Sequence, residues 1–334
     1  MKAIRYHETG GPEVLRFEEV PEPAPGPGEV LLQVHATGVN FADTERRRGL
    51  YDTKVPLPRI LGSEAAGIVT AVGAGVDPAL VGRRVVTLTV GSYAEVVKAQ
   101  ASGLVLLPES VSFEVAAAVP VQGLTAYHLL RTVGQVREGQ SVLVHAAAGG
   151  VGVLAVQLAK AAGARVFGTV SSEAKARLIQ ELGVEEVIRY DREDVVAEVH
   201  KRTGGRGVDL VLDAVGASTW AGSLQALALF GHLVSYGSAS GPPPPVDVEA
   251  LFAKSLKVSA YWLHTPHPPG LHHRALEELV REVAEQRLRI LIGLKLPLAE
   301  AAEAHRRLEG RETVGKVVLT VRSPESPRYR LSGK

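Results

Sequence analysis

The chain has 334 residues, of which 46% are hydrophobic and 22% charged, and its 37 basic and 36 acidic residues leave a net charge of +1. This length favours two domains with separate cores, and the balanced charge gives no sign of the basic face typical of nucleic-acid-binding proteins. No apolar stretch is long enough for a membrane span, and the N-terminus has no signal-peptide h-region, so we expect a cytoplasmic protein.

Cysteine is absent, and asparagine and methionine occur once each, as Asn40 and Met1. The missing cysteine excludes disulfides, thiolate nucleophiles and every zinc site that needs a thiolate ligand. The scarcity of thermolabile residues suggests a thermophilic source, and a GC-rich genome is an alternative explanation of the bias toward proline and arginine. The densest basic run, residues 46–48, is interpreted as a solvated loop or helix edge rather than a phosphate-binding patch.

The first third of the chain is predicted to be β-rich. Short β-branched runs bounded by glycine and proline predict strands over 30–34, 67–72, 84–88 and 94–97. In residues 21–28 every second residue up to 27 is proline, which rules out an interior strand or helix and predicts a surface loop.

From about Gly139 the pattern changes to alternating strands and helices. Apolar runs predict a helix over 150–162 and strands over 141–145, 165–170, 186–190, 208–215, 231–237 and 256–263, and a second helix is predicted over 173–182. Strands that are apolar throughout and separated by helices indicate a doubly wound parallel sheet covered on both faces.

The remainder of the chain is predicted to contain helices over 271–287 and 299–308 and strands over 294–298 and 316–321. About 60 residues are too few for an independent core, so we expect this part to pack against the first third.

A glycine-rich segment, residues 145–152, lies between the first strand of the alternating series and an apolar helix. Glycine lets the backbone turn tightly and approach a pyrophosphate, whose charge is stabilised at the positive N-terminus of the helix. The spacing is a variant of the dinucleotide-binding motif, with alanines in its early positions. A glycine cluster that only packs the helix is the alternative, and the surrounding strands favour the dinucleotide site.

The end of the second strand of this series indicates which dinucleotide is bound. NAD-specific sites carry an acidic residue there for the ribose 2′-hydroxyl, whereas this chain has Ser171, Ser172 and then Lys175. Two hydroxyls and an amine suit a 2′-phosphate, so we predict NADPH. Glu173 lies in the same segment, and its alternative role is to stabilise the helix dipole.

With these residues in view, nearly the whole chain resembles the zinc-free quinone oxidoreductases, the zeta-crystallin-like branch of the medium-chain dehydrogenase/reductase superfamily. The most specific match runs from Gly139 to Lys160 and includes the glycine-rich segment and Gln157. Supporting matches lie at residues 10–15, 38–43, 49–51, 62–67 and 123–127.

The resemblance implies an α/β fold in which a Rossmann domain, residues 121–262, is inserted into a β-rich, GroES-like catalytic domain formed by 1–120 and 263–334. It also implies a cleft between the domains and a homodimer joined through the last Rossmann strand. By position, the pyrophosphate would be held by Gly149, Gly150, Val151 and Gly152, and the 2′-phosphate by Ser171, Lys175 and Tyr190. The nicotinamide half would be bordered by Asp213, Ala214, Val215, Gly216, Tyr236, Gly237 and Ser238, with Arg311 reaching the cofactor from the C-terminal segment.

Zinc-dependent members of the superfamily have Cys where this chain has Asn40 and His where it has Ser63, and their four-cysteine lobe is missing here. Because both changes remove ligands that zinc requires, we predict no metal. Glu64 is retained, and its role is open between a structural carboxylate and a residue of the cleft. The histidines at 264, 267, 272 and 273 are predicted to lie in a surface loop, since prolines interrupt the segment and no helical i, i+4 pair occurs.

Without a Lewis acid, the expected chemistry is transfer of hydride or electrons from NADPH to an acceptor that already stabilises negative charge, such as a quinone. Asn40 and Thr125 are predicted to lie beside the nicotinamide and the substrate carbonyl, with Gln122 as a further candidate. Tyr51 is either a donor to a substrate oxygen or an aromatic wall. Glu45 stands where several relatives have Tyr, which leaves the preferred acceptor open.

Two alternatives remain open. The same scaffold could serve an NADPH-dependent reductase of enones or enals. In a different class, it could serve a crystallin-like cofactor-binding protein or an RNA-binding protein, although the near-neutral charge argues against RNA.

Overall fold

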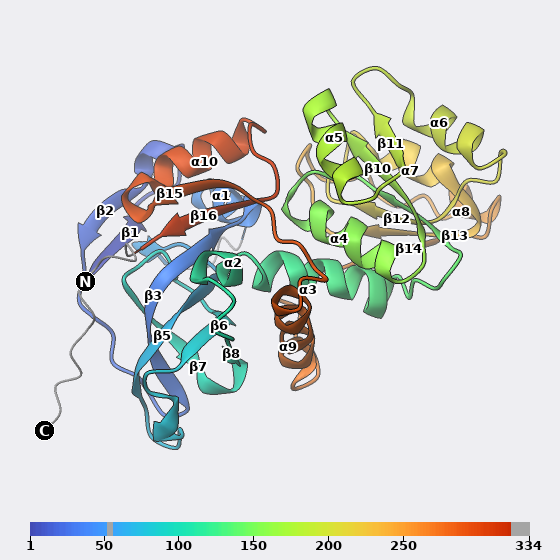
Figure 1. Ribbon diagram of the computed structural model, residues 1–334. Helices are drawn as coiled ribbons and strands as arrows, with labels where there is room; N and C mark the ends of the chain where they lie inside the picture. Colours follow the sequence, from blue (N-terminus) through green and yellow to red (C-terminus); the bar gives the residue numbers. More distant parts are fainter. Residues whose placement is uncertain (52–55, 322–334) are drawn as a thin grey trace, which may run out of the picture. The chain divides into compact units, whose positions relative to one another are not determined.

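The structure is a computed structural model that describes residues 1–51 and 56–321 (Figure 1). Within this part, the chain forms two compact units. The first unit comprises the described residues up to 121, together with 272–280 and 292–321, and the second comprises 122–271 and 281–291. The domain boundaries given above, after residues 120 and 262, stay a prediction.

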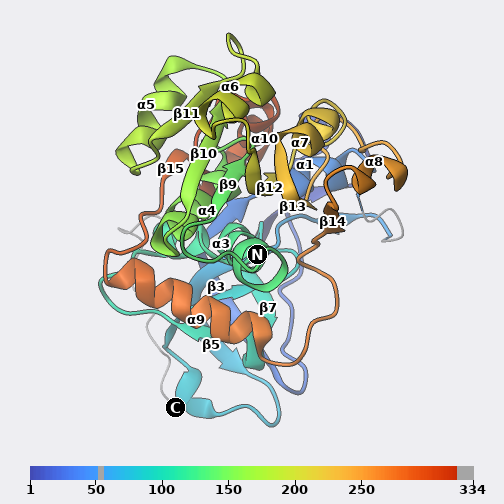
Figure 2. The same cartoon turned by 90° about the vertical axis from the view of Figure 1, so that its right-hand side faces the viewer.

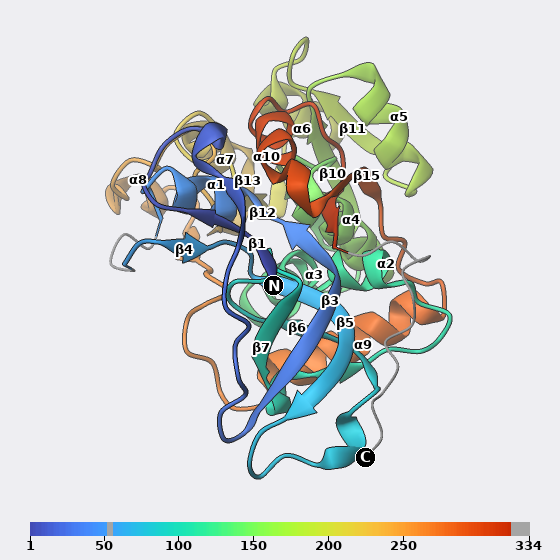
Figure 3. The ribbon, with the colours of Figure 1, turned by 90° about the vertical axis from the view of Figure 1, so that its left-hand side faces the viewer.

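The first unit is built on a seven-stranded sheet, in which β3 (Glu29–Val39) and β5 (Glu64–Val72) are neighbouring central strands (Figure 3). The sheet order is β15-β16-β3-β5-β6-β8, and β7 also pairs with β3. The other strands are β6 (Arg84–Leu88), β7 (Val96–Gln100), β8 (Val105–Leu106), β15 (Ile292–Pro297) and β16 (Lys316–Thr320). A smaller sheet contains β1 (Lys2–Tyr6), β2 (Arg16–Glu19) and β4 (Arg59–Ile60).

Several helices accompany these sheets. They are α1 (Phe41–Arg47), α2 (Phe113–Ala117), α9 (Leu271–Ala284) and α10 (Ala301–Glu309), with short 3-10 turns at Pro12–Val14, Pro78–Leu80, Ala101–Gly103 and Leu298–Glu300. Boundaries between the two units fall in α3 (Pro120–His128) and in α9, of which only residues 272–280 belong to the first unit. A π-helical turn at Leu129–Val133 follows α3.

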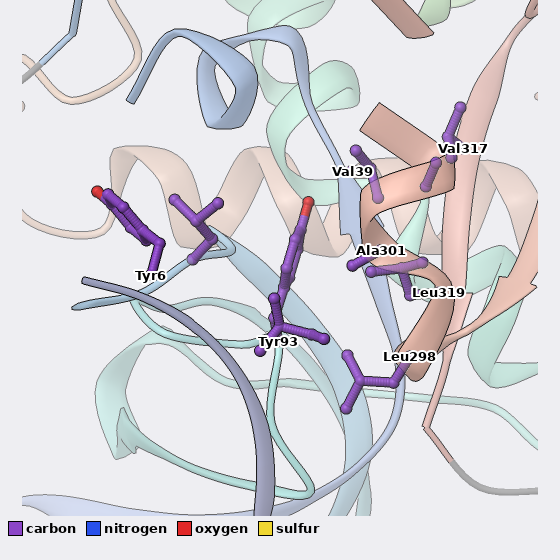
Figure 4. Packing of buried hydrophobic residues seen from close by; sticks show 10 residues of the cluster. Tyr6, Val39, Tyr93, Leu298, Ala301, Val317 and Leu319 are labelled. Carbon is purple, nitrogen blue, oxygen red and sulfur yellow. The ribbon is translucent and has the colours of Figure 1, made fainter. Parts of the chain in front are cut away.

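The last strand of the described chain completes a sheet begun near the N-terminus. β16 runs antiparallel to β3, with Val317 opposite Val39. Figure 4 shows where their side chains meet those of α10 and of Tyr93, in a cluster that also contains Leu298 and Leu319. This confirms the prediction that the C-terminal part packs against the first third of the chain.

The second unit contains a six-stranded parallel sheet, whose strands follow one another across Figure 2 in the order β11-β10-β9-β12-β13-β14. The strands are β9 (Ser141–Val144), β10 (Arg165–Val170), β11 (Glu186–Arg189), β12 (Val208–Asp213), β13 (Leu227–Ser235) and β14 (Lys257–Ala260). The helices are α4 (Gly150–Ala161), α5 (Glu173–Glu181), α6 (Val195–Arg202), α7 (Trp220–Ala226) and α8 (Glu249–Phe252).

Numbered within the unit, this strand order is 3-2-1-4-5-6, the order of dinucleotide-binding Rossmann domains. Five neighbouring strands each contribute one fully buried side chain to a single cluster, namely Leu143, Phe167, Ile188, Val211 and Leu233. The predicted fold class, a doubly wound Rossmann sheet together with a β-rich part, is confirmed.

Some predicted boundaries are wrong. β13 begins at Leu227, four residues before the predicted start, because an irregularity lets the strand continue through Phe230, whose φ is +63°. β14 covers only four of the eight residues predicted as strand. In the first unit, β1 and β2 were not predicted, since their charged residues break the apolar pattern. Among the described residues, no helix has the length and apolar character of a membrane span.

Candidate functional site

The glycine-rich segment lies between β9 and α4, as predicted, with Gly149 as the N-cap of the helix. The helix packs closely on the loop before it, because a β-carbon at Gly152 would lie 2.7 Å from the α-carbon of Ala147. Since Gly149 brings no side chain to the first turn of α4, the backbone amides of that turn have no side-chain cap. Such a turn suits an anion such as a pyrophosphate.

The side chain of Gln122 packs against the start of this helix, where a β-carbon at Gly150 would collide with its amide group. Val151, the next residue, is half-buried. Gln122 therefore contacts the glycine-rich segment within the second unit, whereas it was predicted for the neighbourhood of the substrate.

Residues predicted for a 2′-phosphate follow the neighbouring strands β10 and β11. Ser171 and Lys175 are half-buried, and Tyr190 is half-exposed and donates its backbone N–H to the carbonyl of Val170. Ser172 caps α5 by accepting a hydrogen bond from the backbone N–H of Lys175 at 3.3 Å. The structure thus brings Ser171, Lys175 and Tyr190 to the same carboxyl edge of the sheet.

Glu173, the acidic residue in this segment, is held by two guanidinium groups. Its carboxylate lies 3.3 Å from Arg177 and 3.1 Å from Arg189, and these hydrogen bonds lower its pKa. Arg189 also makes two hydrogen bonds to Asp191, at 3.1 and 2.6 Å. Glu173 is therefore an ion-pair residue as well as a first-turn residue of α5.

Asp213, at the end of β12, is fully buried and organises the loop that follows it. Its carboxylate accepts hydrogen bonds from the backbone amides of Val215 (2.7 Å) and Gly216 (3.1 Å) and from the hydroxyls of Thr219 (2.7 Å) and Ser223 (2.8 Å). These contacts are all within the second unit, and they fix the backbone of the predicted nicotinamide-side residues.

The loops after β12 and β13 pair with each other. Tyr236 donates its backbone N–H to Asp213, and the amides of Ala239 and Ser240 donate to the carbonyls of Ala214 and Val215. Gly216 has a φ of +87°, and a β-carbon there would lie 3.1 Å from the α-carbon of Ser238. Predicted residues Ala214, Gly216, Tyr236, Gly237 and Ser238 are thus brought together.

His145 connects this loop to β10, a role that the sequence analysis missed. Its ring nitrogens lie 3.2 Å from the Thr169 hydroxyl and 3.0 Å from the Ser223 hydroxyl. Burial lowers the pKa of His145, opposed by the nearby Asp213 carboxylate. A neutral imidazole therefore joins the start of the glycine-rich segment to β10 and α7.

In the first unit, Asn40 belongs to a buried triad with Glu64 and Lys316. The Asn40 amide nitrogen donates to Glu64 Oε1 at 2.7 Å, and the Lys316 ammonium donates to Asn40 Oδ1 at 2.7 Å and to Glu64 Oε1 at 2.6 Å. The other Glu64 oxygen accepts the backbone N–H of Val121 at 2.7 Å. Glu64 thus binds neighbouring groups of its own unit, whichever further role it has.

Ser63, at the position of a zinc-ligating histidine in relatives, belongs to a second network. The Arg46 guanidinium donates to Ser63 Oγ at 2.9 Å and to Asp43 Oδ1 at 3.1 Å. Asp43 also accepts from the backbone N–H of Asn40 (2.9 Å) and from the Tyr93 hydroxyl (3.3 Å). The prediction that residues 46–48 are solvated is wrong for Arg46 and Arg47, which are both buried. Arg46 pairs with the buried carboxylate of Asp43, and Arg47 pairs with Glu309 at 2.6 Å.

The remaining predicted residues are distributed over both units. Tyr51 stacks under the Arg46 guanidinium at 4.7 Å, and Thr125 is buried on α3 in the second unit. Arg311 follows α10 in the first unit and has a φ of +58°. Glu45 is half-buried, and this burial raises its pKa despite the opposing charges of Arg48 and Arg46.

The histidine segment is only partly a surface loop. His264 is exposed and His267 stacks on Tyr261, whereas His272 and His273 lie in the first turn of α9. Within residues 1–51 and 56–321, no group of three or more histidine, aspartate or glutamate side chains could hold a metal ion.

Sequence reasoning missed Lys316, Asp43 and the partners of Arg46. Lys316 could have been noticed as a lone lysine at the start of an otherwise apolar strand. Asp43 lies three residues after Asn40, the spacing at which a helix-start residue meets the first turn. Neither pattern indicates which distant side chain completes the contact.

Comparisons with known proteins match both units. The Zinc-binding dehydrogenase family model matches residues 150–285, and the Alcohol dehydrogenase GroES-like domain model matches residues 26–109. A quinone oxidoreductase of Pseudomonas aeruginosa is 44% identical over 95% of this chain and 99% of its own length. A 2-haloacrylate reductase of a Burkholderia species is 38% identical over 95% of this chain and 98% of its own length.

Among solved structures, the Escherichia coli quinone oxidoreductase complexed with NADPH is 39% identical and matches with a TM-score of 0.91, covering 96% of this chain and all of that chain. The similarity therefore extends over both units and includes the glycine-rich segment. The chain belongs to the quinone oxidoreductase family of the medium-chain dehydrogenase/reductase superfamily.

Proposed function

We propose that this protein is an NADPH-dependent quinone oxidoreductase that works without zinc. The observation that carries the proposal is made at the carboxyl edge of the Rossmann sheet. There the first turn of α4, which has no side-chain cap, follows β9, and Ser171 and Lys175 follow the neighbouring strand β10. The close relatives are quinone oxidoreductases, and one of them was solved with NADPH.

The chain's residues fit the cofactor. Backbone amides of Gly150, Val151 and Gly152 would hold the pyrophosphate, since this first helical turn lacks a side-chain cap. Ser171, Lys175 and Tyr190 would bind the 2′-phosphate, because hydroxyls and an ammonium are its natural donors. The paired loops at 214–216 and 236–238 would border the nicotinamide half, and Arg311 would contact the cofactor from the C-terminal part. When bound, NADPH supplies the reducing equivalents.

On the acceptor side, we propose Asn40, Thr125 and Tyr51 as the residues that act on the quinone. Asn40 offers an amide N–H to a carbonyl oxygen, and Tyr51 offers a hydroxyl or an aromatic face. Zinc independence is supported by the contacts of Asn40 and Ser63, which lie at former ligand positions and bind the cations Lys316 and Arg46 instead. Orientation of the reactants, rather than a Lewis acid, would then provide most of the rate.

Steady-state oxidation of NADPH with 1,4-benzoquinone and naphthoquinones tests the proposal. We expect turnover with at least one quinone and a clear preference for NADPH over NADH. Addition of a chelator should leave the rate unchanged. No NADPH oxidation with any quinone would refute the assignment of the acceptor.

The second candidate function is reduction of an activated alkene. It is favoured by the 2-haloacrylate reductase relative, which is 38% identical to this chain. A panel of enones, enals and acrylates beside the quinones separates the two: a higher kcat/KM on alkenes would make alkene reduction the main activity.

We also propose a homodimer formed through β14. This strand is one of the two edge strands of the six-stranded sheet, and the neighbouring Phe230 and Phe252 are 67% and 72% exposed. Unpaired strand edges flanked by apolar side chains favour association. Sedimentation of the wild type and of Phe230→Glu tests this: a dimer that dissociates in the variant is expected.

The proposed cofactor also supports a cytoplasmic location, which cell fractionation can test.

A further inference from the structure

Lys316 is a buried cation that donates hydrogen bonds to two side chains of its own unit. It begins β16 and is 1% exposed, and its ammonium donates to Asn40 and Glu64 at 2.7 and 2.6 Å. A lysine is almost never fully buried unless its charge is paired. Gly38 of β3 leaves room for this pair, since a β-carbon there would lie 2.5 Å from Lys316 Cε and 2.7 Å from the Glu64 carboxyl carbon.

Glu64 is itself fixed in place. Its Oε1 accepts from Asn40 and Lys316, and its Oε2 accepts the backbone N–H of Val121 at the start of α3. The carboxylate is fully buried, so it cannot turn away without losing these donors. The triad therefore has one arrangement that satisfies every charge.

This arrangement fixes the direction of the Asn40 amide. Its oxygen faces the ammonium of Lys316 and its nitrogen faces the carboxylate of Glu64. A reversed amide would set an NH2 group against an ammonium and an oxygen against a carboxylate. Each Asn amide nitrogen carries two hydrogens, and Glu64 takes one of them, which leaves the second for another acceptor.

We propose that Lys316 is a positioning residue for the reaction: together with Glu64, it orients Asn40 so that the second amide hydrogen is presented to the acceptor's carbonyl oxygen. The ammonium also draws electron density from the amide oxygen, which makes the nitrogen a stronger donor. This inference rests on the proposed quinone reduction.

The chemistry balances without a proton from the triad. In the two-electron form, a quinone, NADPH and a solvent proton give a hydroquinone and NADP⁺. Negative charge grows on the carbonyl oxygen, and the Asn40 N–H donates to that oxygen. Lys316 donates no proton to the quinone, and its charge is balanced by Glu64. The triad therefore acts by orienting the Asn40 amide, not by adding net charge to the site.

Asparagine-selective ¹⁵N labelling gives a direct test, because Asn40 is the only asparagine in the chain. The wild type should show one side-chain NH2 pair with two well-separated proton shifts, the downfield proton exchanging slowly because it is bonded to Glu64. Lys316→Met should bring the two shifts together, and Lys316→Arg should largely preserve them. A rapidly exchanging, nearly degenerate pair in the wild type would overturn the proposal without any variant.

Kinetics supply the second readout. Lys316→Met alone leaves the buried Glu64 carboxylate without its counterion. The double variant Glu64→Gln/Lys316→Met removes both charges, and the side-chain oxygen of the introduced glutamine can still accept the backbone N–H of Val121. We expect kcat with quinone to fall roughly tenfold or more in both variants, with KM for NADPH within about twofold of the wild type. Lys316→Arg should recover most of kcat. Arg47→Met, which breaks the separate ion pair with Glu309 (2.6 Å), controls for general destabilisation.

The outcomes separate the inference from the function. If the double variant folds and keeps wild-type kcat, Lys316 has only a structural role and the inference fails, while quinone reduction stands. If the wild type reduces no quinone but shows the expected Asn40 resonances, the proposed function fails and the amide orientation stands.

Discussion

Helix α4 approaches the loop after β9 so closely at Gly152 that a β-carbon there would lie 2.7 Å from the α-carbon of Ala147. The carbonyl oxygen of Ala147 would also lie 2.7 Å from this β-carbon. Because both atoms of Ala147 belong to the backbone, neither can move aside easily. The close approach sets the start of the helix against the end of the strand, which is where the pyrophosphate is proposed to bind.

Gly152→Ala should therefore damage both folding and cofactor binding. We expect a loss of about 1–3 kcal/mol in the free energy of unfolding, measured by urea denaturation, and a large rise in the KM for NADPH. Gly222→Ala is the matched control. It lies in α7 with 3.4 Å to Val196 Cγ2 and should be neutral or stabilising. Equal stability of the two variants would contradict the packing argument.

The strands of the second unit were easier to predict from the sequence than those of the first. The strands of the second unit were predictable because β9, β10 and β12 are buried along nearly their whole length and read as continuous apolar runs. β1 escaped prediction because Lys2 and Arg5 interrupt Ala3, Ile4 and Tyr6, although these three are buried.

In the candidate site, local sequence patterns could be predicted, but contacts between residues far apart in the chain could not. The glycine-rich segment is local, so its position between a predicted strand and a predicted helix was enough to predict a dinucleotide site there. The contact between Asn40 and Lys316 joins residues 276 positions apart, and no local pattern encodes it. Glu173 was a partial case: its place in the first turn of α5 was predictable, but its ion pair with Arg189 depends on the pairing of β10 with β11.

Lys175→Ala should raise the KM for NADPH roughly tenfold or more, because it removes a charged partner of the 2′-phosphate. The KM for NADH, which lacks that phosphate, should change little. Lys201→Ala removes an equally positive side chain from α6, where Lys201 pairs with Glu198 at 3.0 Å, and should affect neither. Equal effects of Lys175→Ala on both cofactors would reject the phosphate role.

Arg189→Gln should weaken the preference for NADPH. The substitution frees Asp191 and leaves Glu173 with Arg177 alone, so uncompensated negative charge arises beside the proposed phosphate site. We expect the KM for NADPH to rise about threefold to tenfold at low ionic strength, and the rise to shrink in salt. The ratio of KM values for NADPH and NADH, measured at two salt concentrations, checks this. A rise that salt does not reduce would point to a distorted loop instead.

Asn40→Ala should lower kcat with quinone by roughly tenfold to a hundredfold, and leave the dissociation constant of NADPH nearly unchanged. The reason is that the amide is proposed to donate to the acceptor rather than to the cofactor. Cofactor affinity from fluorescence titration and turnover from NADPH oxidation separate the two effects. An unaltered kcat would return Asn40 to a purely structural role.

Asp209→Asn should reduce stability at neutral pH but not in acid. The Asp209 carboxylate accepts hydrogen bonds from Arg206 (2.8 Å) and from the backbone amide of Ser141 (2.7 Å), and these lower its pKa to about 2 from the usual 3.8. A carboxylate with a depressed folded-state pKa stabilises the fold above its unfolded pKa and loses that contribution as pH falls through the folded value.

We therefore expect wild type and Asp209→Asn to differ by about 1 kcal/mol in unfolding free energy at pH 7, after allowance for solvent screening. The difference should shrink between pH 4 and pH 2. Urea titrations across this range measure it. A difference that persists at pH 2 would mean that packing, not charge, is lost in the variant.

The return of β16 to pair with β3 has a consequence for biosynthesis. Almost all of the second unit, residues 122–271, is a continuous stretch that can fold once the ribosome has passed it. The first unit is made first but cannot close its sheet until residues 316–320 emerge, and Lys316 arrives with them. Until then β3 exposes an unpaired edge, and Glu64 lacks its ammonium partner. The segment that carries Asn40 and Glu64 is thus synthesised before the second unit but matures after it, and its proposed chemistry depends on the later arrival of Lys316.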